Sequence, residues 1–370
     1  MKRLLIAAGG GGDAITAAMV HAALYGPDAP ALVLTYAWER LVVDPVPGPR
    51  GAADFTGLLT PVPGLHLVTP RTAPKAPAGS LLPRLAAHLR PALGLLDPYG
   101  GTLGLARQID AAARWCGADR IDLVDVGGDI VARGDEPTLR SPLGDALALA
   151  ACAATGIPTT VYVAGPGLDN EVPLPALMPR LGEPAFTLAP EDTDGVLAVF
   201  DWHPSEAGAV LVAAARGVRG VCGTRDAPRP LVLDDSARQV HRLTCAEALR
   251  LNPLAGALGL CSGLEAAEEA SYEVCGFSEI ARERRRAATA PAVPRPRPRP
   301  PADPGTLLVR FGRWERSRLA EGLDYVTTRR ITEELDLAPL EADDLYRNLR
   351  AGAPPRRVPP LWRLADVRGT

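Results

Sequence analysis

The chain has 370 residues, of which 47% are hydrophobic and 22% charged, and its formal net charge is −3. This composition is typical of a soluble globular protein, and no apolar stretch reaches the roughly 20 residues needed to cross a bilayer. The charge balance gives no sign of a nucleic-acid or membrane partner. Of the 40 basic residues only Lys2 and Lys75 are lysines, and neither is placed for a P-loop or a pyridoxal pocket, so we expect no pyridoxal phosphate.

The cysteines and the first residues favour a cytoplasmic protein. The six cysteines include no CxxC pair and no nearby histidine with zinc-finger spacing. They are most simply buried thiols in a reducing compartment. The apolar start of the chain runs directly into four glycines and an aspartate, which favours a buried strand and its loop over a signal peptide.

Short apolar runs alternate with amphipathic stretches of helical length along the first 225 residues. This pattern predicts a Rossmann-like, doubly wound α/β fold with a mainly parallel sheet. The predicted strands are Arg3–Ala8, Ala31–Tyr36, Leu65–Val68, Leu93–Leu96, Ile121–Val126, Thr159–Val163 and Gly220–Cys222. The predicted helices are Ala14–Leu24, Leu81–Leu89, Leu103–Trp115, Pro142–Ala153 and Ser205–Arg216.

The rest of the chain predicts a helical appendage. Residues 245–286 have helical periodicity and would complete a ligand-binding or catalytic domain over residues 1–286, with its core in residues 1–225. Residues 287–304 predict a linker, because from Pro291 to Pro304 proline alternates with arginine. Residues 305–350 predict a small helical module and residues 351–370 a Pro/Arg-rich tail. The acidic residues of this module balance the charge of its arginines, so we expect it to serve in protein packing or interaction and not to bind DNA. A homo-oligomer stays open.

The first predicted strand ends in a glycine loop that favours an anionic ligand. Its residues are Gly9, Gly10, Gly11, Gly12 and Asp13. Glycines let a ligand approach the backbone closely, and the helix that follows directs free N–H groups toward it. A phosphate or carboxylate would suit such a loop. Asp13 is a candidate acid, although it could simply cap the helix.

Two further strand ends carry acids. Glu39 follows the second strand, at the place where an acid holds a ribose hydroxyl in dinucleotide-binding folds. A solvated ion pair with Arg40 is an equal alternative for Glu39. Asp97 opens a glycine turn after the strand Leu93–Leu96 and is a further candidate acid.

The loops after Ile121–Val126 and Thr159–Val163 are the richest in acids and glycines. The first contains Asp125, Gly127, Gly128 and Asp129, with Arg140 and Ser141 further on, and the second contains Gly165, Gly167 and Asp169. Ser141 stands at the N-cap position before Pro142. Arg140 could clamp a phosphate with two hydrogen bonds or be an ordinary surface charge.

These loops should meet, because the carboxyl ends of parallel strands lie along one edge of a sheet. We therefore expect Asp13, Asp97, Asp125, Asp129 and Asp169 to converge. Clustered carboxylates repel one another, so the cluster implies a metal, a cationic or polyol ligand, or a carboxyl with a raised pKa. We predict that Asp125 and Asp129 bind Mg²⁺ or act as acid and base, assisted by Asp13 and Asp97.

Two isolated residues carry weaker signals. Cys261 lies in a GLCSG sequence with the spacing of a nucleophile elbow, but the residues before it predict a helix where an elbow needs a strand. His203, three residues before Glu206, could shuttle a proton or simply belong to a loop at a helix start.

Five separated motifs resemble those of one known family, in the same order. They are GGGGD (Gly9–Asp13), YAWERLVVDPVPGPR (Tyr36–Arg50), LDPYGG (Leu96–Gly101), VDVGGDIVARGDEPTLRSPLGDA (Val124–Ala146) and AGPGLD (Ala164–Asp169). Over about residues 1–245 the chain resembles the domain-of-unknown-function family numbered eleven fifty-two. Because that family has no defined activity, the resemblance implies the fold and the choice of loops but no reaction.

The leading functional hypothesis is an enzyme that acts on a small phosphorylated or nucleoside-like metabolite. Carboxylates or Mg²⁺ would assist hydrolysis or group transfer at a glycosidic or C–N bond. The glycine loop and the helix terminus near Leu143 would hold the anionic group of this substrate. One alternative is a nucleotide-type cofactor, NAD or S-adenosylmethionine, with Glu39 as the ribose ligand. Another is a non-catalytic metabolite sensor that signals through residues 305–350.

Overall fold

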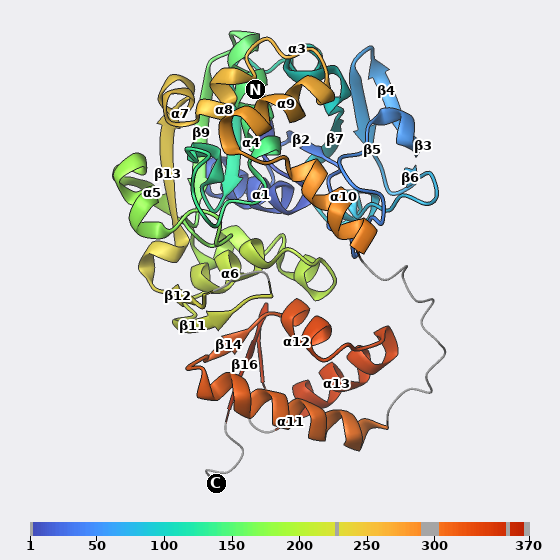
Figure 1. Cartoon of the computed structure of the whole chain (residues 1–370), viewed down its shortest axis with the longest axis vertical. Coiled ribbons are helices and arrows are strands. Elements are labelled where there is room, and N and C mark those ends of the chain that lie inside the picture. Colours follow the sequence, from blue (N-terminus) through green and yellow to red (C-terminus); the bar gives the residue numbers. More distant parts are fainter. Residues whose placement is uncertain (1–2, 226–228, 290–302, 353–355, 366–370) are drawn as a thin grey trace.

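The computed structural model describes residues 3–225, 229–289, 303–352 and 356–365. These residues form two units, and a mixed sheet lies at the centre of the larger one (Figure 1). Within these residues the sheet has nine strands, in the spatial order β10 (Pro184–Thr187), β13 (Gln239–Thr244), β9 (Thr159–Ala164), β8 (Ile121–Val126), β1 (Arg3–Ala7), β2 (Ala31–Tyr36), β7 (Ala92–Leu96), β5 (Leu65–Val68) and β4 (Leu59–Val62). The strands from β9 to β7 are parallel, and the outer strands on both sides are antiparallel. A separate short ladder joins β3 (Phe55–Thr56) to β6 (Ala73–Pro74).

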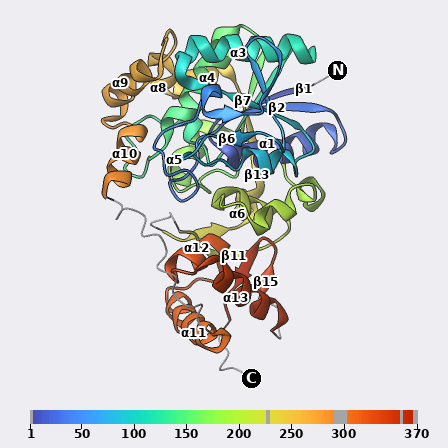
Figure 2. The ribbon, with the colours of Figure 1, turned by 90° about the vertical axis from the view of Figure 1, so that its right-hand side faces the viewer.

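Helices cover both faces of this sheet (Figure 2). Leu5 and Ala7 of β1 belong to one hydrophobic core and Leu4 and Ile6 to the other, because successive strand residues point to opposite faces. The first core includes residues of α1 (Gly11–Tyr25), α2 (Leu82–Ala86) and α6 (Glu206–Ala215). The second includes residues of α3 (Gly101–Cys116), α4 (Pro142–Thr155), α5 (Leu174–Leu181), α7 (Cys245–Leu251), α8 (Pro253–Ala257), α9 (Leu264–Cys275) and α10 (Glu279–Thr289).

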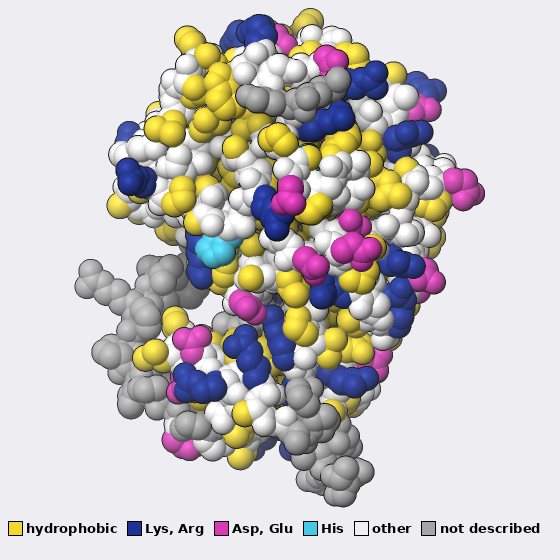
Figure 3. All heavy atoms as spheres, turned by 180° about the vertical axis from the view of Figure 1, so that it is seen from behind, with side chains coloured by type: hydrophobic (Ala, Val, Ile, Leu, Met, Phe, Trp, Pro, Cys, Tyr) yellow, Lys and Arg dark blue, Asp and Glu magenta, His cyan; other side chains and the backbone are white. Residues whose placement is uncertain are grey.

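The smaller unit is built around a second sheet next to α6. Its described strands follow the order β12 (Leu231–Leu233), β11 (Gly220–Gly223), β14 (Tyr325–Val326), β16 (Leu361–Arg363) and β15 (Arg357–Val358). Its helices are α11 (Pro304–Ala320), α12 (Thr328–Glu334) and α13 (Pro339–Ala351). Cys222, Tyr325 and Leu361 share a hydrophobic core with Val210 of α6, so apolar packing joins the two units. On its rear face, basic and acidic side chains lie next to one another (Figure 3).

The predicted α/β class with a helical C-terminal part is confirmed. Most predicted strand ranges agree with the structure to within a residue, and Ala31–Tyr36, Leu65–Val68 and Ile121–Val126 agree completely. Leu65–Val68, however, runs antiparallel to β7. Among the described residues, none of the helices has the length and hydropathy needed to cross a membrane.

Several features differ from the prediction, among them the unpredicted edge strands β4 and β10 of the central sheet. Residues 239–244 were not predicted as a strand, yet β13 pairs antiparallel with β9 in the central sheet. The predicted strand at Gly220–Cys222 lies in the second sheet, parallel to β14. The predicted Pro/Arg-rich tail contains β15 and β16, so it is partly a hairpin. For the predicted linker over 287–304, α10 extends to Thr289 and α11 starts at Pro304, while residues 290–302 are outside the described residues.

Candidate functional site

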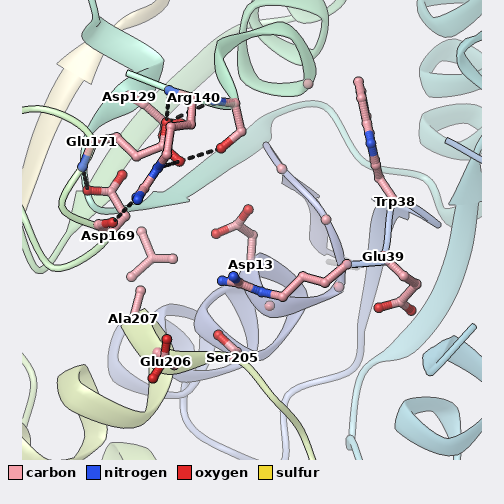
Figure 4. A pocket seen from close by; sticks show the side chains of 18 of the residues that line it. Asp13, Trp38, Glu39, Asp129, Arg140, Asp169, Glu171, Ser205, Glu206 and Ala207 are labelled. Atoms are coloured by element: carbon pink, nitrogen blue, oxygen red, sulfur yellow. Dashed lines mark hydrogen bonds and ion pairs between the residues drawn. The ribbon is translucent and has the colours of Figure 1, made fainter. Parts of the chain in front are cut away.

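A cavity of about 440 Å³ lies at the carboxyl ends of the central strands, where β1 and β8 are neighbours. The chain passes from β1 to β2 and β7 on one side and from β8 to β9 on the other. Loops from the two sides therefore diverge at this point and leave room between them. The described residues that line it come from the glycine loop, from the loops after the central strands and from α10 (Figure 4); they include residues 9–13, 38–41, 125–126, 129, 140–141, 144–145, 168–169, 171 and 203–207, with Glu279, Arg282, Glu283 and Arg286 of α10.

Three buried carboxylates lie together in this cavity. Asp125 is the penultimate residue of β8, Asp129 begins a short 3-10 helix, and Asp145 lies in the first turn of α4. The three are 1%, 6% and 4% exposed, respectively. Each offers a carboxylate oxygen, and these atoms lie within 4.8 Å of one another. We call Asp125, Asp129 and Asp145 the carboxylate cluster.

The environment of the carboxylate cluster opposes its full ionisation. Burial raises the pKa of Asp125 to about 7. Burial, followed by the charges of the neighbouring acids, raises the pKa of Asp129 and that of Asp145 well above their ordinary values. Within the described part of the chain, Oδ2 of Asp125 and Oδ1 of Asp145 are buried without a hydrogen-bond partner. A cation between these oxygens would remove both the repulsion and the unsatisfied acceptors, and carboxylate oxygens are ligands that Mg²⁺ accepts.

Two glycines bring Asp129 back toward Asp125. Gly127 and Gly128 have φ angles of 112° and 114°, which a residue with a side chain rarely adopts. They reverse the chain after β8, and a β-carbon on Gly127 would lie 2.2 Å from the Cγ atom of Asp169. These glycines therefore form the turn, and among the described residues they are not part of the cavity wall.

Asp13 faces the carboxylate cluster from the glycine loop. The N-cap of α1 is Gly10, so Asp13 lies in the first turn of the helix and is not its cap. A β-carbon on Gly9 would lie 2.2 Å from Oδ2 of Asp13, because the side chain folds back over the loop. Burial, and then the charge of Asp125, raises the pKa of Asp13 well above its ordinary value. Figure 4 shows its carboxylate directed into the cavity.

Glu171 organises the opposite wall. Its Oε2 accepts hydrogen bonds from the backbone N–H groups of Arg140 (2.6 Å) and Ser141 (2.8 Å), and its Oε1 accepts one from the Ser141 hydroxyl (2.5 Å). The Arg140 side chain donates to the Asp169 carbonyl at 2.8 Å. Arg140 and Ser141 thus line the cavity as predicted, but much of their hydrogen-bonding capacity holds the wall itself together.

His203 presents an unsatisfied donor to the cavity. It is 8% exposed, and its Nδ1 accepts a hydrogen bond from the backbone N–H of Ser205 at 3.2 Å. Nδ1 then carries no proton, and the neutral ring has its proton on Nε2. Among the described residues Nε2 is buried without a partner. Burial, and then the charge of Arg40, lowers the pKa of His203 to about 3, which keeps the ring neutral at physiological pH.

Guanidinium groups from several elements also line the cavity. They belong to Arg40, Arg140, Arg282, Arg286 and Arg329. Arg282 and Arg286 come from α10, and Arg329 comes from α12 of the smaller unit. The cavity therefore combines buried acids with arginines, an arrangement suited to a metal ion together with an anionic ligand.

The sequence comparisons identify a family for most of the chain. The model of the family described as "Protein of unknown function (DUF1152)" matches residues 4–287. The chain belongs to this family. No curated protein and no solved structure matches the chain. The DUF1152 segment contains the central sheet apart from Arg3, the first residue of β1. Of the described cavity residues it contains all but Arg329, which lies beyond the end of the family match.

Within the DUF1152 segment, many of the predicted residues line one cavity. These are Gly9, Gly10, Gly11, Gly12, Asp13, Glu39, Asp125, Asp129, Arg140, Ser141 and Asp169. Glu39 is 8% exposed, and its Oε1 accepts hydrogen bonds from the backbone N–H of Leu81 (2.7 Å) and the Ser80 hydroxyl (3.4 Å). Glu39 therefore also supports the chain before α2.

Asp97 does not join the others, so its predicted convergence on the site is wrong. Its Oδ1 accepts from the backbone N–H of Tyr99 (3.0 Å) and its Oδ2 from that of Ala52 (2.8 Å), which fixes two loops on the far side of β2. Gly165 and Gly167, with φ angles of 56° and 79°, shape the turn after β9 and, within the described chain, do not line the cavity.

Sequence reasoning did not select Asp145, Glu171 or Glu279 as site residues. Asp145 sits in the first turn of α4, where an acid is the usual complement to the helix dipole, so nothing marked it as unusual. Burial raises the pKa of Glu279 well above its ordinary value. This residue comes from α10, some 150 residues after β8 in the chain, and no local pattern could have placed it here.

Proposed function

We propose that the carboxylate cluster binds Mg²⁺ and that the protein is an enzyme acting on a small phosphorylated or nucleoside-like metabolite. The observation that carries this proposal is the set of three buried carboxylates with ligand atoms within 4.8 Å and two unpartnered oxygens. Such a group is costly to bury unless a cation or protons neutralise it. A bound Mg²⁺ would hold phosphate oxygens and assist hydrolysis or group transfer.

The strand order supports the interpretation of the sheet as Rossmann-like. Numbered along the chain, the parallel strands β1, β2, β7, β8 and β9 lie in the order 3-2-1-4-5. This is the order found in dinucleotide-binding folds, whose ligands bind where the order reverses. The cavity has this position between β1 and β8.

The arginines at the cavity favour an anionic substrate. Arg282 and Arg286 project from α10, and Arg140 lies at the start of α4. A phosphorylated ligand could contact these guanidinium groups with some oxygens and the metal with others, so that its charge is shared between the two. A ligand that binds both the metal and the guanidinium groups would account for the presence of acids and arginines in the same cavity.

Asp13 is the residue best suited to transfer a proton. Burial and the charge of Asp125 raise its pKa, so Asp13 holds a proton more readily than an ordinary aspartate does. Its carboxylate faces the cavity without belonging to the carboxylate cluster. It would give a proton to a leaving group or take one from a nucleophile.

A nucleotide-type cofactor fits the same cavity less well. Glu39, its candidate ribose ligand, is already bonded to Leu81 and Ser80. The carboxylate of Asp13 lies over Gly9, where the pyrophosphate of a dinucleotide would need free backbone N–H groups. The metal-assisted reaction is therefore the better-supported function.

Titration calorimetry with Mg²⁺ and Mn²⁺ on the full chain tests the metal site. We expect Asp129→Asn and Asp145→Asn to weaken binding by at least about tenfold, since each removes an anionic ligand. The matched control is Asp122→Asn, on the same strand as Asp125, because Asp122 accepts a hydrogen bond from the Tyr25 hydroxyl (2.9 Å) and is not among the described residues that line the cavity. Equal metal affinity in the wild type and both cluster variants would refute the site.

Activity is then sought with a panel of phosphorylated and nucleoside-like metabolites, with and without Mg²⁺. We expect turnover that requires the metal and that falls strongly in Asp13→Asn while metal binding persists. Turnover that survives both metal removal and Asp129→Asn would contradict a metal-assisted reaction.

A further inference from the structure

The end of the cavity near α6 is built partly by the smaller unit. Arg329 of α12 lines the cavity with a side chain that is 10% exposed. Its Nη1 lies 3.2 Å from Oε2 of Glu206, and its Nε donates to Oε1 of Glu333 at 2.6 Å. Two carboxylates thus fix the direction of this guanidinium group, although it lies outside the DUF1152 match.

Glu206 is the anchor between the two units. It is 5% exposed, and its Oε1 accepts hydrogen bonds from the backbone N–H of Arg225 (2.8 Å) and from the hydroxyl of Thr327. With Arg329 on Oε2, the negative charge of Glu206 is shared among donors from both units. Its carboxylate is therefore largely neutralised by the protein and repels a ligand less than a solitary acid would.

Two helix N-termini meet at this end. A β-carbon on Gly12 of α1 would lie 2.8 Å from Oγ of Ser205, the N-cap of α6, and one on Gly11 would lie 3.9 Å from Nε2 of His203. Both helices direct the positive ends of their dipoles here. The Nε2 group of His203, a buried donor without a partner among the described residues, lies beside Gly11 at this end of the cavity.

Two guanidinium groups, those of Arg40 and Arg329, line this end of the cavity and lie near enough to influence one another. The Arg40 side chain has a solvent-exposed surface at the cavity. Desolvation by the surrounding protein, and then the charge of Arg329, lowers its pKa to about 10. Arg225 forms an ion pair with Glu333 (3.2 Å) and Arg329 forms one with Glu206 (3.2 Å), so these acids hold the arginines of the smaller unit in place. Repulsion between two nearby cations is relieved when an anion binds between them.

We propose that Arg40, His203 and Arg329 form a second anion subsite, which takes a phosphate group of the substrate at the end of the cavity next to α6. Donors from different directions suit a tetrahedral phosphate better than a planar carboxylate. If the carboxylate cluster holds a metal-bound phosphate, as the proposed function assumes, the substrate is a metabolite with two phosphate groups. The smaller unit is then a part of the binding site.

Metal-free titration of the full chain with orthophosphate, at pH 7.5 and in the presence of a chelator, tests this subsite. We expect Arg329→Gln to weaken orthophosphate binding on the order of tenfold or more, the usual effect of losing one charged hydrogen bond. The matched control is Arg330→Gln on the same helix. Arg330 makes ion pairs with Glu334 and Glu321 and is not among the described residues that line the cavity. The orthophosphate affinity of the Arg330→Gln variant should therefore stay within about twofold of wild type.

His203→Phe provides a second variant that leaves the smaller unit untouched. It removes the Nε2 donor and should also weaken orthophosphate binding, with circular dichroism confirming that the variant is folded. Equal orthophosphate affinity in wild type, Arg329→Gln and His203→Phe would overturn the subsite.

The two proposals fail separately. Asp129→Asn should lose Mg²⁺ binding and keep metal-free orthophosphate binding. Arg329→Gln should weaken orthophosphate binding and keep Mg²⁺ binding. If Arg329→Gln and His203→Phe both leave orthophosphate binding unchanged while Asp129→Asn loses Mg²⁺ binding, the subsite is wrong and the metal site stands. If Asp129→Asn alone has no effect, the metal site is wrong and the subsite stands.

Discussion

Asp125→Asn offers a direct measure of how strongly the fold opposes the charge of the carboxylate cluster. The folded-state pKa of Asp125 is about 7 against an ordinary value of 3.8. The folded protein therefore binds this proton more tightly than the unfolded chain does. Stability from this group is complete below the ordinary pKa and is lost as the pH rises toward the folded value.

The size of the effect follows from the shift. About three pKa units correspond to an upper bound of about 4 kcal/mol. Because the titration of Asp125 is coupled to that of its acidic neighbours, we expect the metal-free Asp125→Asn variant to be more stable than wild type by about 2–4 kcal/mol at pH 8. For a chain of this size that is a rise in melting temperature of roughly 3–5 °C. Near pH 4 the difference should nearly vanish.

Differential scanning calorimetry at pH 4, 6 and 8, with chelator and with 10 mM Mg²⁺, is the suitable assay. At pH 8 we expect Mg²⁺ to stabilise the wild type, by about 3 kcal/mol if the metal is present at 100 times its Kd, and to have little effect on Asp125→Asn. Asp122→Asn should retain the full response to Mg²⁺. A metal-free Asp125→Asn variant that is less stable than wild type at pH 8 would refute the reasoning, since the carboxylate would then be well satisfied within the fold.

Three further substitutions test the framework of the site by urea unfolding. Gly127→Ala should cost at least about 2 kcal/mol, because φ is 112° and the new methyl group would meet Asp169; a loss below half of that would show that the turn can relax. Glu171→Gln should cost about 1–3 kcal/mol, because it removes the charge that holds the start of α4, and an unchanged midpoint would contradict this role. Glu206→Gln should cost about 2 kcal/mol by weakening the contact with Arg329, and it should leave Mg²⁺ affinity unchanged.

The sequence predicted the central elements because their signals are local. The buried strand Ile121–Val126 is apolar on both faces apart from its two aspartates, and Gly127 and Gly128 mark its end. The strand, the turn and the acidic residues can therefore all be predicted from the local sequence. The glycine loop at residues 9–12 is equally clear. Parallel strands then place these loops at one edge of the sheet without further information.

Other parts depend on contacts between distant segments. Asp97 looked equivalent to Asp125, but it hydrogen-bonds to the N–H of Ala52, and the position of that loop has no local signal. The strand Gln239–Thr244 carries His241 and Arg242 and became part of the central sheet through its pairing with β9. Arg329 is brought to the cavity by the docking of a whole unit, which no spacing in the sequence reveals.

The pairing of β11 with β14 has a consequence for the order in which the protein folds. Cys222 lies opposite Tyr325, so β11, which is inside the family segment, pairs with a strand about one hundred residues further along the chain. During synthesis the edge of β11 that β14 later covers stays open until that partner has left the ribosome, and contacts of such long sequence separation form slowly. An open strand edge is a site where chains associate wrongly. Chains that stop at the end of the family segment would keep that edge, and we expect them to aggregate where the full chain does not.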